Sequence, residues 1–139
     1  MGLIESFALG GTLKIIGIAA LTICLGILMG AFGAHGLEGK VKPERIETWN
    51  TAALYHLFNA LGLLFWGMLR EQKPQAVPLG AVFLLGFGLL VFSGSLYALV
   101  LLDKAILGAI TPLGGLALSC AWAWLGIHQL RQQKSPHSG

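Results

Sequence analysis

Four long stretches of the chain contain no Asp, Glu, Lys or Arg: residues 15–34, 48–69, 74–102 and 105–130. A helix rises about 1.5 Å per residue, so it needs roughly twenty apolar residues to cross the hydrocarbon core of a bilayer. Each stretch is long enough. The pattern therefore predicts an all-α integral membrane protein with transmembrane helices over residues 14–34, 48–69, 77–102 and 105–129, and a polar tail over 130–139.

Composition agrees with this interpretation. Hydrophobic residues make up 55% of the chain and charged residues 11%, where soluble proteins carry about a quarter charged residues. We therefore expect a single membrane domain over residues 1–139 and no soluble domain. The first span resembles a secretory signal, but its apolar run exceeds the usual length of such signals, so we expect it to stay as a helix.

The connections between the spans define two sides of the membrane. Four crossings place both termini and the connection at 70–74 on one side, the tail side, and the loop at 36–47 and the turn at 103–104 on the other, the loop side. Short connections predict that helices adjacent in the sequence pack antiparallel. Basic residues are divided almost equally between the sides, so the positive-inside rule only weakly favours a cytoplasmic tail side.

The loop at 36–47 contains signals of its own. Pro43 suits the first position of a helix, and Glu44 follows in the first turn, where an acidic group complements the helix dipole. We expect a helix to start there and to place Lys40, Lys42 and Arg45 toward water or lipid phosphates. The alternative is a solvated charged loop. Tryptophans are expected at the membrane interfaces, at Trp49, Trp66, Trp122 and Trp124.

Each span carries a stripe of small or polar residues at helical spacing. Lipid tails are as apolar as leucine, so membrane helices associate by close backbone approach and by hydrogen bonds between helices. The stripes predict an antiparallel four-helix bundle whose packing residues are Gly26, Gly30, Gly33, Gly94, Gly108, Pro112 and Gly115.

Polar side chains gather in the loop-side half of the predicted bundle. His56 lies roughly 12 Å below the start of its span, and residues of the other spans reach a similar depth. Pro112 would free the carbonyl of Gly108, which then needs another donor. The candidate ligand-binding residues are His35, Tyr55, His56, Asn59, Ser93, Ser95, Tyr97 and Thr111. The alternative is a structural network with a neutral His56 bonded to Asn59, Thr111 or a backbone carbonyl.

Four motifs carry a resemblance to a known family: Gly30 to Gly36, Thr51-Ala52 with Tyr55-His56, Phe92 to Tyr97, and Gly108 to Gly115. In this order they resemble the small membrane proteins of domain of unknown function 423, a family that includes bacterial YgdD and eukaryotic transmembrane protein 256. The resemblance covers nearly the whole chain between the first and fourth spans. It implies a multi-pass protein of the bacterial inner membrane and transfers no activity. Asn59 stands where relatives usually have a histidine.

The chemistry of the spans favours a protein without catalysis. The spans contain no carboxylate, no pair of histidines at metal spacing and no phosphate-binding loop, so we expect no catalytic residue, metal ion or cofactor. The first hypothesis is a structural or accessory bundle that packs with itself or with a larger membrane partner. The alternative is a binder or transporter of a small molecule, a lipid or protons. Expected partners are membrane lipids and other membrane proteins, and no nucleic acid.

Overall fold

The structure is a computed structural model that describes the backbone of residues 3–133 and the side chains of residues 14–133. It consists of helices α1 (Leu3–Gly36), α2 (Pro43–Gln72), α3 (Leu79–Leu102) and α4 (Thr111–Gln133), with a short 3-10 helix, η1 (Ala105–Ala109), before α4. Four segments are long and apolar enough to cross a membrane: Lys14–Gly36, Pro43–Gln72, Leu79–Leu102 and Ala105–Gln133. The predicted all-α membrane fold is confirmed.

Local sequence explains where the helices begin and end. The second helix starts at Pro43, as predicted, with Glu44 in its first turn. The third helix ends at Leu102 and is capped by Asp103, whose φ of 49° is left-handed and whose N–H donates to the carbonyl of Leu99. Aspartate tolerates this conformation better than most residues do, so it can end a helix where glycine is usual.

The fourth span differs from the continuous helix that was predicted. It opens with η1, and α4 begins only at Thr111, so Pro112 lies in the first turn of α4 and not in a helix interior. A missing N–H costs nothing in that turn. The helix then continues through Gln133, beyond the predicted end at 129, and residues 134–139 of the predicted polar tail lie outside the described part of the chain.

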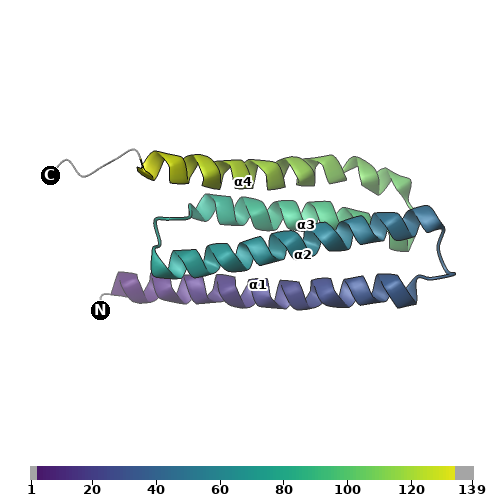
Figure 1. The fold of residues 1–139 in the computed structure, drawn as a ribbon, viewed down its shortest axis with the longest axis horizontal. Coiled ribbons are helices and arrows are strands. Elements are labelled where there is room, and N and C mark those ends of the chain that lie inside the picture. Colours follow the sequence, from purple (N-terminus) through teal and green to yellow (C-terminus); the bar gives the residue numbers. More distant parts are fainter. Residues whose placement is uncertain (1–2, 134–139) are drawn as a thin grey trace.

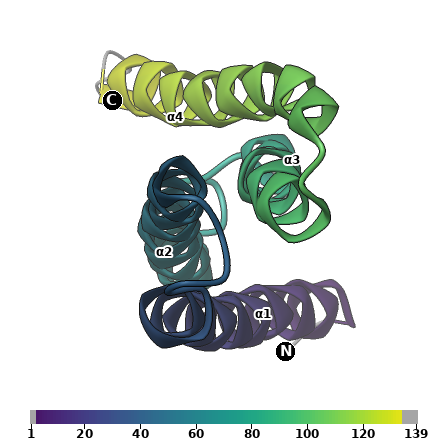
Figure 2. The same cartoon turned by 90° about the vertical axis from the view of Figure 1, so that its right-hand side faces the viewer.

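The helices run antiparallel and pack in the order of the chain (Figure 1). Within the described residues 3–133, the backbones of α1 and α2, of α2 and α3, and of α3 and α4 lie close together, whereas no such approach joins α1 to α3 or α4, or α2 to α4. Figure 2 shows α1 and α4 on opposite sides of the central α2–α3 pair. The four stripes therefore form three successive interfaces and do not meet on one axis.

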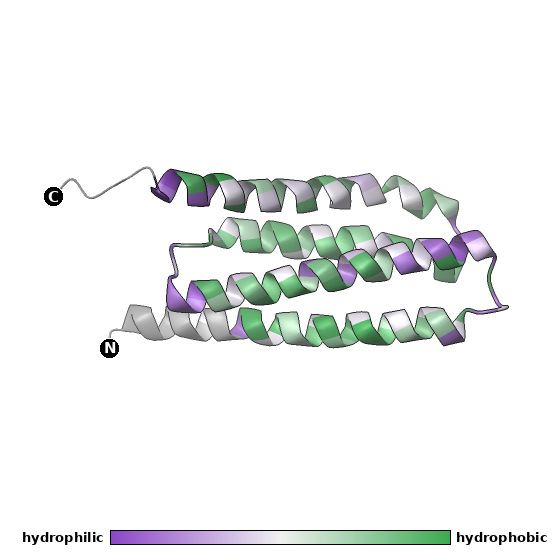
Figure 3. Cartoon of the chain, viewed as in Figure 1, coloured by the Kyte–Doolittle hydropathy of each residue, from purple (hydrophilic) through white to green (hydrophobic). Residues whose placement is uncertain are grey.

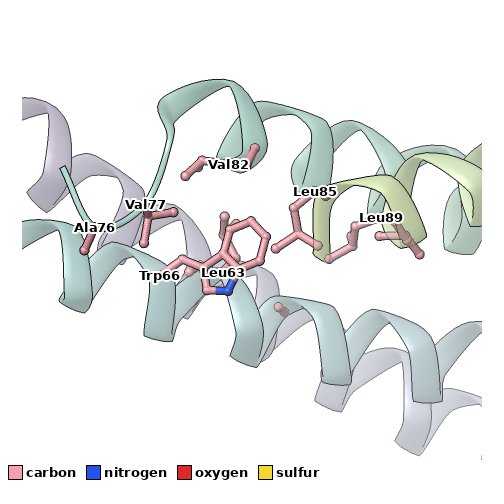
Figure 4. Close-up of a cluster of buried hydrophobic side chains, with 12 residues drawn as sticks. Leu63, Trp66, Ala76, Val77, Val82, Leu85 and Leu89 are labelled. Carbon is pink, nitrogen blue, oxygen red and sulfur yellow. The ribbon is translucent and has the colours of Figure 1, made fainter. Parts of the chain in front are cut away.

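Apolar side chains form two clusters along the bundle. The tail-side cluster surrounds Trp66, Val77 and Leu85 (Figure 4), and the loop-side cluster surrounds Trp49, Ala52 and Tyr97. Trp49 and Trp66 are fully buried within the bundle, so neither presents its ring to the lipid headgroups. Hydrophilic residues concentrate near the helix ends, which fits a membrane-spanning orientation (Figure 3).

Candidate functional site

Two aromatic ring N–H groups of α2 reach backbone carbonyls of α1. Nε1 of Trp49 donates to the Met29 carbonyl at 2.7 Å, and Nε2 of His56 lies 2.9 Å from the Thr22 carbonyl. The two donors are seven residues apart on α2, and the two acceptors are seven apart on α1. Seven residues are close to two helical turns, so both bonds lie on the same face of each helix.

Glycines of α1 make room for these rings. A Cβ atom at Gly33 would lie 2.3 Å from Cδ1 of Trp49, and one at Gly26 would lie 2.7 Å from Leu57 and 3.3 Å from His56. Gly26 and Gly33, both predicted packing residues, therefore lie against α2. Gly30 does not, because a Cβ placed there meets no atom within 4 Å. The packing expected at Gly30 is absent from the described part of the chain.

His56 has a partner at each ring nitrogen. Because the Thr22 carbonyl can only accept, Nε2 must carry the proton, and Nδ1 of a neutral ring then accepts from the Tyr97 hydroxyl at 3.2 Å. The side chain is only 3% exposed. Of the structural alternatives considered from sequence, the backbone carbonyl is the partner found here, and Asn59 and Thr111 are not.

Ser93 joins the same region from α3. Its hydroxyl donates to the Ala52 carbonyl of α2 at 2.9 Å, and the side chain is buried. His56, Ser93 and Tyr97 line a groove of about 270 Å³ between α1 and α3, which we call the α1–α3 groove. Its other lining residues are mostly apolar or glycine: Ile18, Thr22, Leu25, Leu63, Gly86, Leu89, Leu90 and Gly94.

Other predicted site residues lie elsewhere in the fold. Ser95 and Thr111 share a hydroxyl hydrogen bond of 2.7 Å between α3 and α4, and neither lines the α1–α3 groove. Tyr55 is exposed and stacks against Phe92 with ring centroids 4.6 Å apart. His35 is exposed near the end of α1. The structure thus brings three of the eight candidates together in this groove.

Asn59 belongs to a different contact, on the α4 side of α2. Its Oδ1 accepts from Nε1 of Trp122 at 3.0 Å, and its Nδ2 donates to the Tyr55 carbonyl at 2.8 Å. Gly62 lies beneath the Trp122 ring, where a Cβ would approach it to 2.5 Å. The sequence predicts Trp122 at the membrane interface and does not indicate this contact with α2.

The α3–α4 interface depends on Gly88 and Gly114, which are not among the packing residues predicted from the stripes. A Cβ at Gly114 would lie 2.3 Å from the backbone nitrogen of Phe92, and one at Gly88 would lie 2.8 Å from that of Leu118. A Cβ at Gly115, a predicted packing residue, would meet the Phe92 ring at an ordinary contact distance of 3.5 Å. A Cβ at Gly108 would lie 3.2 Å from Leu99, one at Gly94 would meet no atom within 4 Å, and Pro112 is exposed.

The arrangement defines a multi-pass membrane protein in which the buried polar side chains of His56, Asn59 and Ser93 bond to other side chains or to backbone carbonyls. Among the described side chains of residues 14–133, no three from His, Cys, Asp or Glu are grouped so that they could hold a metal ion. The sequence profile of the family described as "Protein of unknown function (DUF423)" matches residues 29–115. The chain belongs to this family.

Curated relatives extend the match over most of the chain. The UPF0382 membrane protein YwdK of Bacillus subtilis is 41% identical over 114 residues, which cover 79% of this chain and 90% of the relative. A UPF0382 membrane protein of Staphylococcus epidermidis is 42% identical, covering 82% and 93%. One from the yeast Schizosaccharomyces pombe is 36% identical, covering 76% and 92%. No solved structure matches the chain.

Proposed function

We propose that this protein is a non-catalytic accessory bundle that packs against a transmembrane helix of another polypeptide, either a second copy or a larger membrane partner, through the α1–α3 groove. One observation carries the proposal. The polar side chains of the groove have partners within the chain, while the surface beside them is apolar and contains glycines with open space above them.

A binding site for a polar small molecule needs convergent polar groups that are free to bond to it. In the groove, both nitrogens of His56 and the hydroxyl of Ser93 are already engaged. This arrangement offers little to a polar ligand. The alternative function, binding or transport of a small molecule, a lipid or protons by this polar cluster, is therefore the weaker candidate.

A helix partner needs a different surface. Small residues let two backbones approach closely, and van der Waals packing then replaces contacts with lipid. Gly86 and Gly94 lie eight residues apart on α3, and a Cβ at either position meets no atom within 4 Å. Leu90 lies between them and is 71% exposed. Eight residues are close to two helical turns, so both glycines lie on the face of α3 that carries Leu90 and leave room beside it for another helix.

Photo-crosslinking in native membranes tests the proposal. A benzophenone amino acid at Leu90, in the groove, should give a discrete adduct with a polypeptide, whereas the same probe at Leu116 should not. Leu116 is a matched control because it is also an exposed apolar residue, 63% exposed, but lies on α4 and does not line the groove. Mass spectrometry of the adduct distinguishes a second copy from another protein.

A second test introduces a bulky side chain into the α1–α3 groove. Gly94→Leu should abolish the adduct, and Gly126→Leu, at a glycine of α4 that also has open space around it, should leave it unchanged. Lipid adducts alone at Leu90 would contradict the accessory function and favour the binding alternative. Equal protein adducts at both probe positions would show that the groove is not the contact surface.

We also propose that the protein resides in the inner membrane of a bacterium. Transmembrane α-helices support this location, because the proteins that cross bacterial outer membranes are β-barrels. The match to bacterial membrane proteins is consistent with it, although the family also has a yeast member. Fractionation of the membranes by density should recover the protein with inner-membrane markers.

A further inference from the structure

A second concave surface lies on the loop side, at the ends of the helices. It is a cleft of about 510 Å³ between the connection after α1, the start of α2 and the end of α3. Lys40, Lys42, Arg45 and Asp103 line it, together with Val100 and Leu101. Figure 3 shows hydrophilic residues gathered at this end of α2. We call it the loop-side cleft, and it shares no lining residue with the α1–α3 groove.

The fold places most of the basic residues of the loop side at the cleft and most of its acidic residues elsewhere. Four basic residues (Lys40, Lys42, Arg45, Lys104) and four acidic residues (Glu38, Glu44, Glu47, Asp103) lie on this side, so its formal charge is zero. The cleft is lined by three of the basic residues and one of the acidic ones, which gives it a formal charge of +2. The three glutamates do not line it. A positive cleft therefore exists on a side of the protein that is neutral as a whole.

Arg45 is held in place at this cleft. Its Nε and Nη2 lie 2.9 and 2.8 Å from Oδ1 of Asp103, the residue that ends α3 in a left-handed conformation. The Arg45 side chain is 25% exposed. Because the ion pair uses only two of the three guanidinium nitrogens, Nη1 is left for another anion. A fixed guanidinium loses less conformational entropy on binding than a free side chain does.

The cleft also borders the lipid-facing surface. Leu101 lines the cleft, and the neighbouring Leu102 and Ile106 are exposed apolar residues at the same end of the bundle. A basic recess beside exposed leucine and isoleucine matches a molecule with a phosphate at one end and hydrocarbon at the other. Basic pockets at the ends of transmembrane helices bind lipid headgroups by this chemistry. We propose that the loop-side cleft binds the phosphate of an anionic phospholipid.

Native mass spectrometry of the purified full-length protein tests the assignment. The protein is released from detergent after incubation with phosphatidylglycerol or with phosphatidylcholine at equal concentrations. Phosphatidylglycerol should be retained preferentially, because its net charge is negative and that of phosphatidylcholine is zero. Neutralising both lysines in Lys40→Gln/Lys42→Gln should weaken its binding by roughly fivefold for each lysine, since a basic side chain near an anionic surface contributes about 1 kcal/mol.

Lys104→Gln is the matched control, because Lys104 is an exposed lysine on the same side that does not line the cleft. It should keep the preference for phosphatidylglycerol. Equal retention of the two lipids by the unaltered protein would overturn the proposal, and so would an equal loss in Lys104→Gln, which would indicate diffuse charge attraction. All variants lie at exposed positions, and a monodisperse elution profile verifies their fold.

A competition experiment distinguishes a lipid from a soluble phosphate as the ligand of the cleft. Glycerol phosphate or inorganic phosphate at millimolar concentration should fail to displace bound phosphatidylglycerol, because neither contacts the apolar border at Leu101. Displacement would overturn the lipid assignment and give the cleft to a soluble phosphate. This experiment does not involve the α1–α3 groove, so its outcome is independent of the proposed function.

Discussion

The hydroxyl of Tyr97 supplies the hydrogen bond that a neutral His56 needs at Nδ1. Tyr97→Phe removes that donor and leaves a buried acceptor without a partner, so we expect a loss of about 1 kcal/mol in the free energy of unfolding. Unfolding of the purified protein by sodium dodecyl sulfate in mixed micelles measures the loss. Tyr55→Phe is the control, since the Tyr55 side chain is 44% exposed, and it should leave stability unchanged. Equal stabilities for both variants would refute the hydrogen bond at His56.

Gly33 and Gly30 offer a second comparison at single residues. Gly33→Ala places a methyl group against the fully buried ring of Trp49, which cannot move away without disturbing its bond to the Met29 carbonyl. Overpacking of this kind costs about 1–3 kcal/mol. Gly30→Ala meets open space on the same helix and should be neutral. The same unfolding assay checks the difference, and a destabilised Gly30→Ala variant would contradict the placement of α1.

At the scale of elements, the α3–α4 interface is a contact of backbone against backbone. Gly114→Ala would push its Cβ into the backbone of Phe92, so the two helices would have to separate. Gly115→Ala, at the next residue, meets only the edge of the Phe92 ring at a normal distance. We therefore expect a loss of about 1–3 kcal/mol or more for Gly114→Ala and little change for Gly115→Ala. Similar losses for both variants would show that α4 does not turn Gly114 toward the backbone of α3.

Sequence patterns predicted the helices well and their facing surfaces less well. Charge-free runs identify the spans because a bilayer excludes charges, and Pro43 marks the start of α2. The stripe of α1 did not distinguish Gly30 from Gly33, although only Gly33 lies against a ring of α2. Both glycines lie on one broad face, and the deciding factor is the position of Trp49 on another helix. A seven-residue spacing shared by Gly26 and Gly33 was the signal available.

Only part of the candidate site could be predicted, because the sequence indicates the depth of a residue in the membrane but not the neighbour that it faces. Depth in the membrane correctly grouped His56, Ser93 and Tyr97, because residues at one level of neighbouring helices can meet. Depth does not indicate direction around a helix axis. Thr111 lies on the opposite side of α3 from the groove and bonds to Ser95. Assigning it to the His56 cluster assumed four helices around one axis, and the helices instead pack in series.

At the scale of the whole molecule, serial packing leaves α1 and α4 each with one main neighbour. Side chains that reach beyond the main interface then become important for the position of an outer helix. On the α4 side, Trp122 reaches past α3 to Asn59 of α2, and its ring covers Gly62. The Trp122 side chain thus connects two helices whose backbones are not in contact. We expect this connection to help fix the position of α4 on the central pair.

A double-mutant cycle measures that connection. Asn59→Ala and Trp122→Phe each break the 3.0 Å bond between Oδ1 and Nε1, so their combined loss of stability should be smaller than the sum of the single losses. Hydrogen bonds between membrane helices suggest a coupling of about 0.6–1.7 kcal/mol. Trp124→Phe is the control partner, because Trp124 is on the same helix but packs over Gly80 of α3. Its losses should add to those of Asn59→Ala. Additive losses for Trp122→Phe as well would mean that α4 is positioned by its backbone contacts with α3 alone.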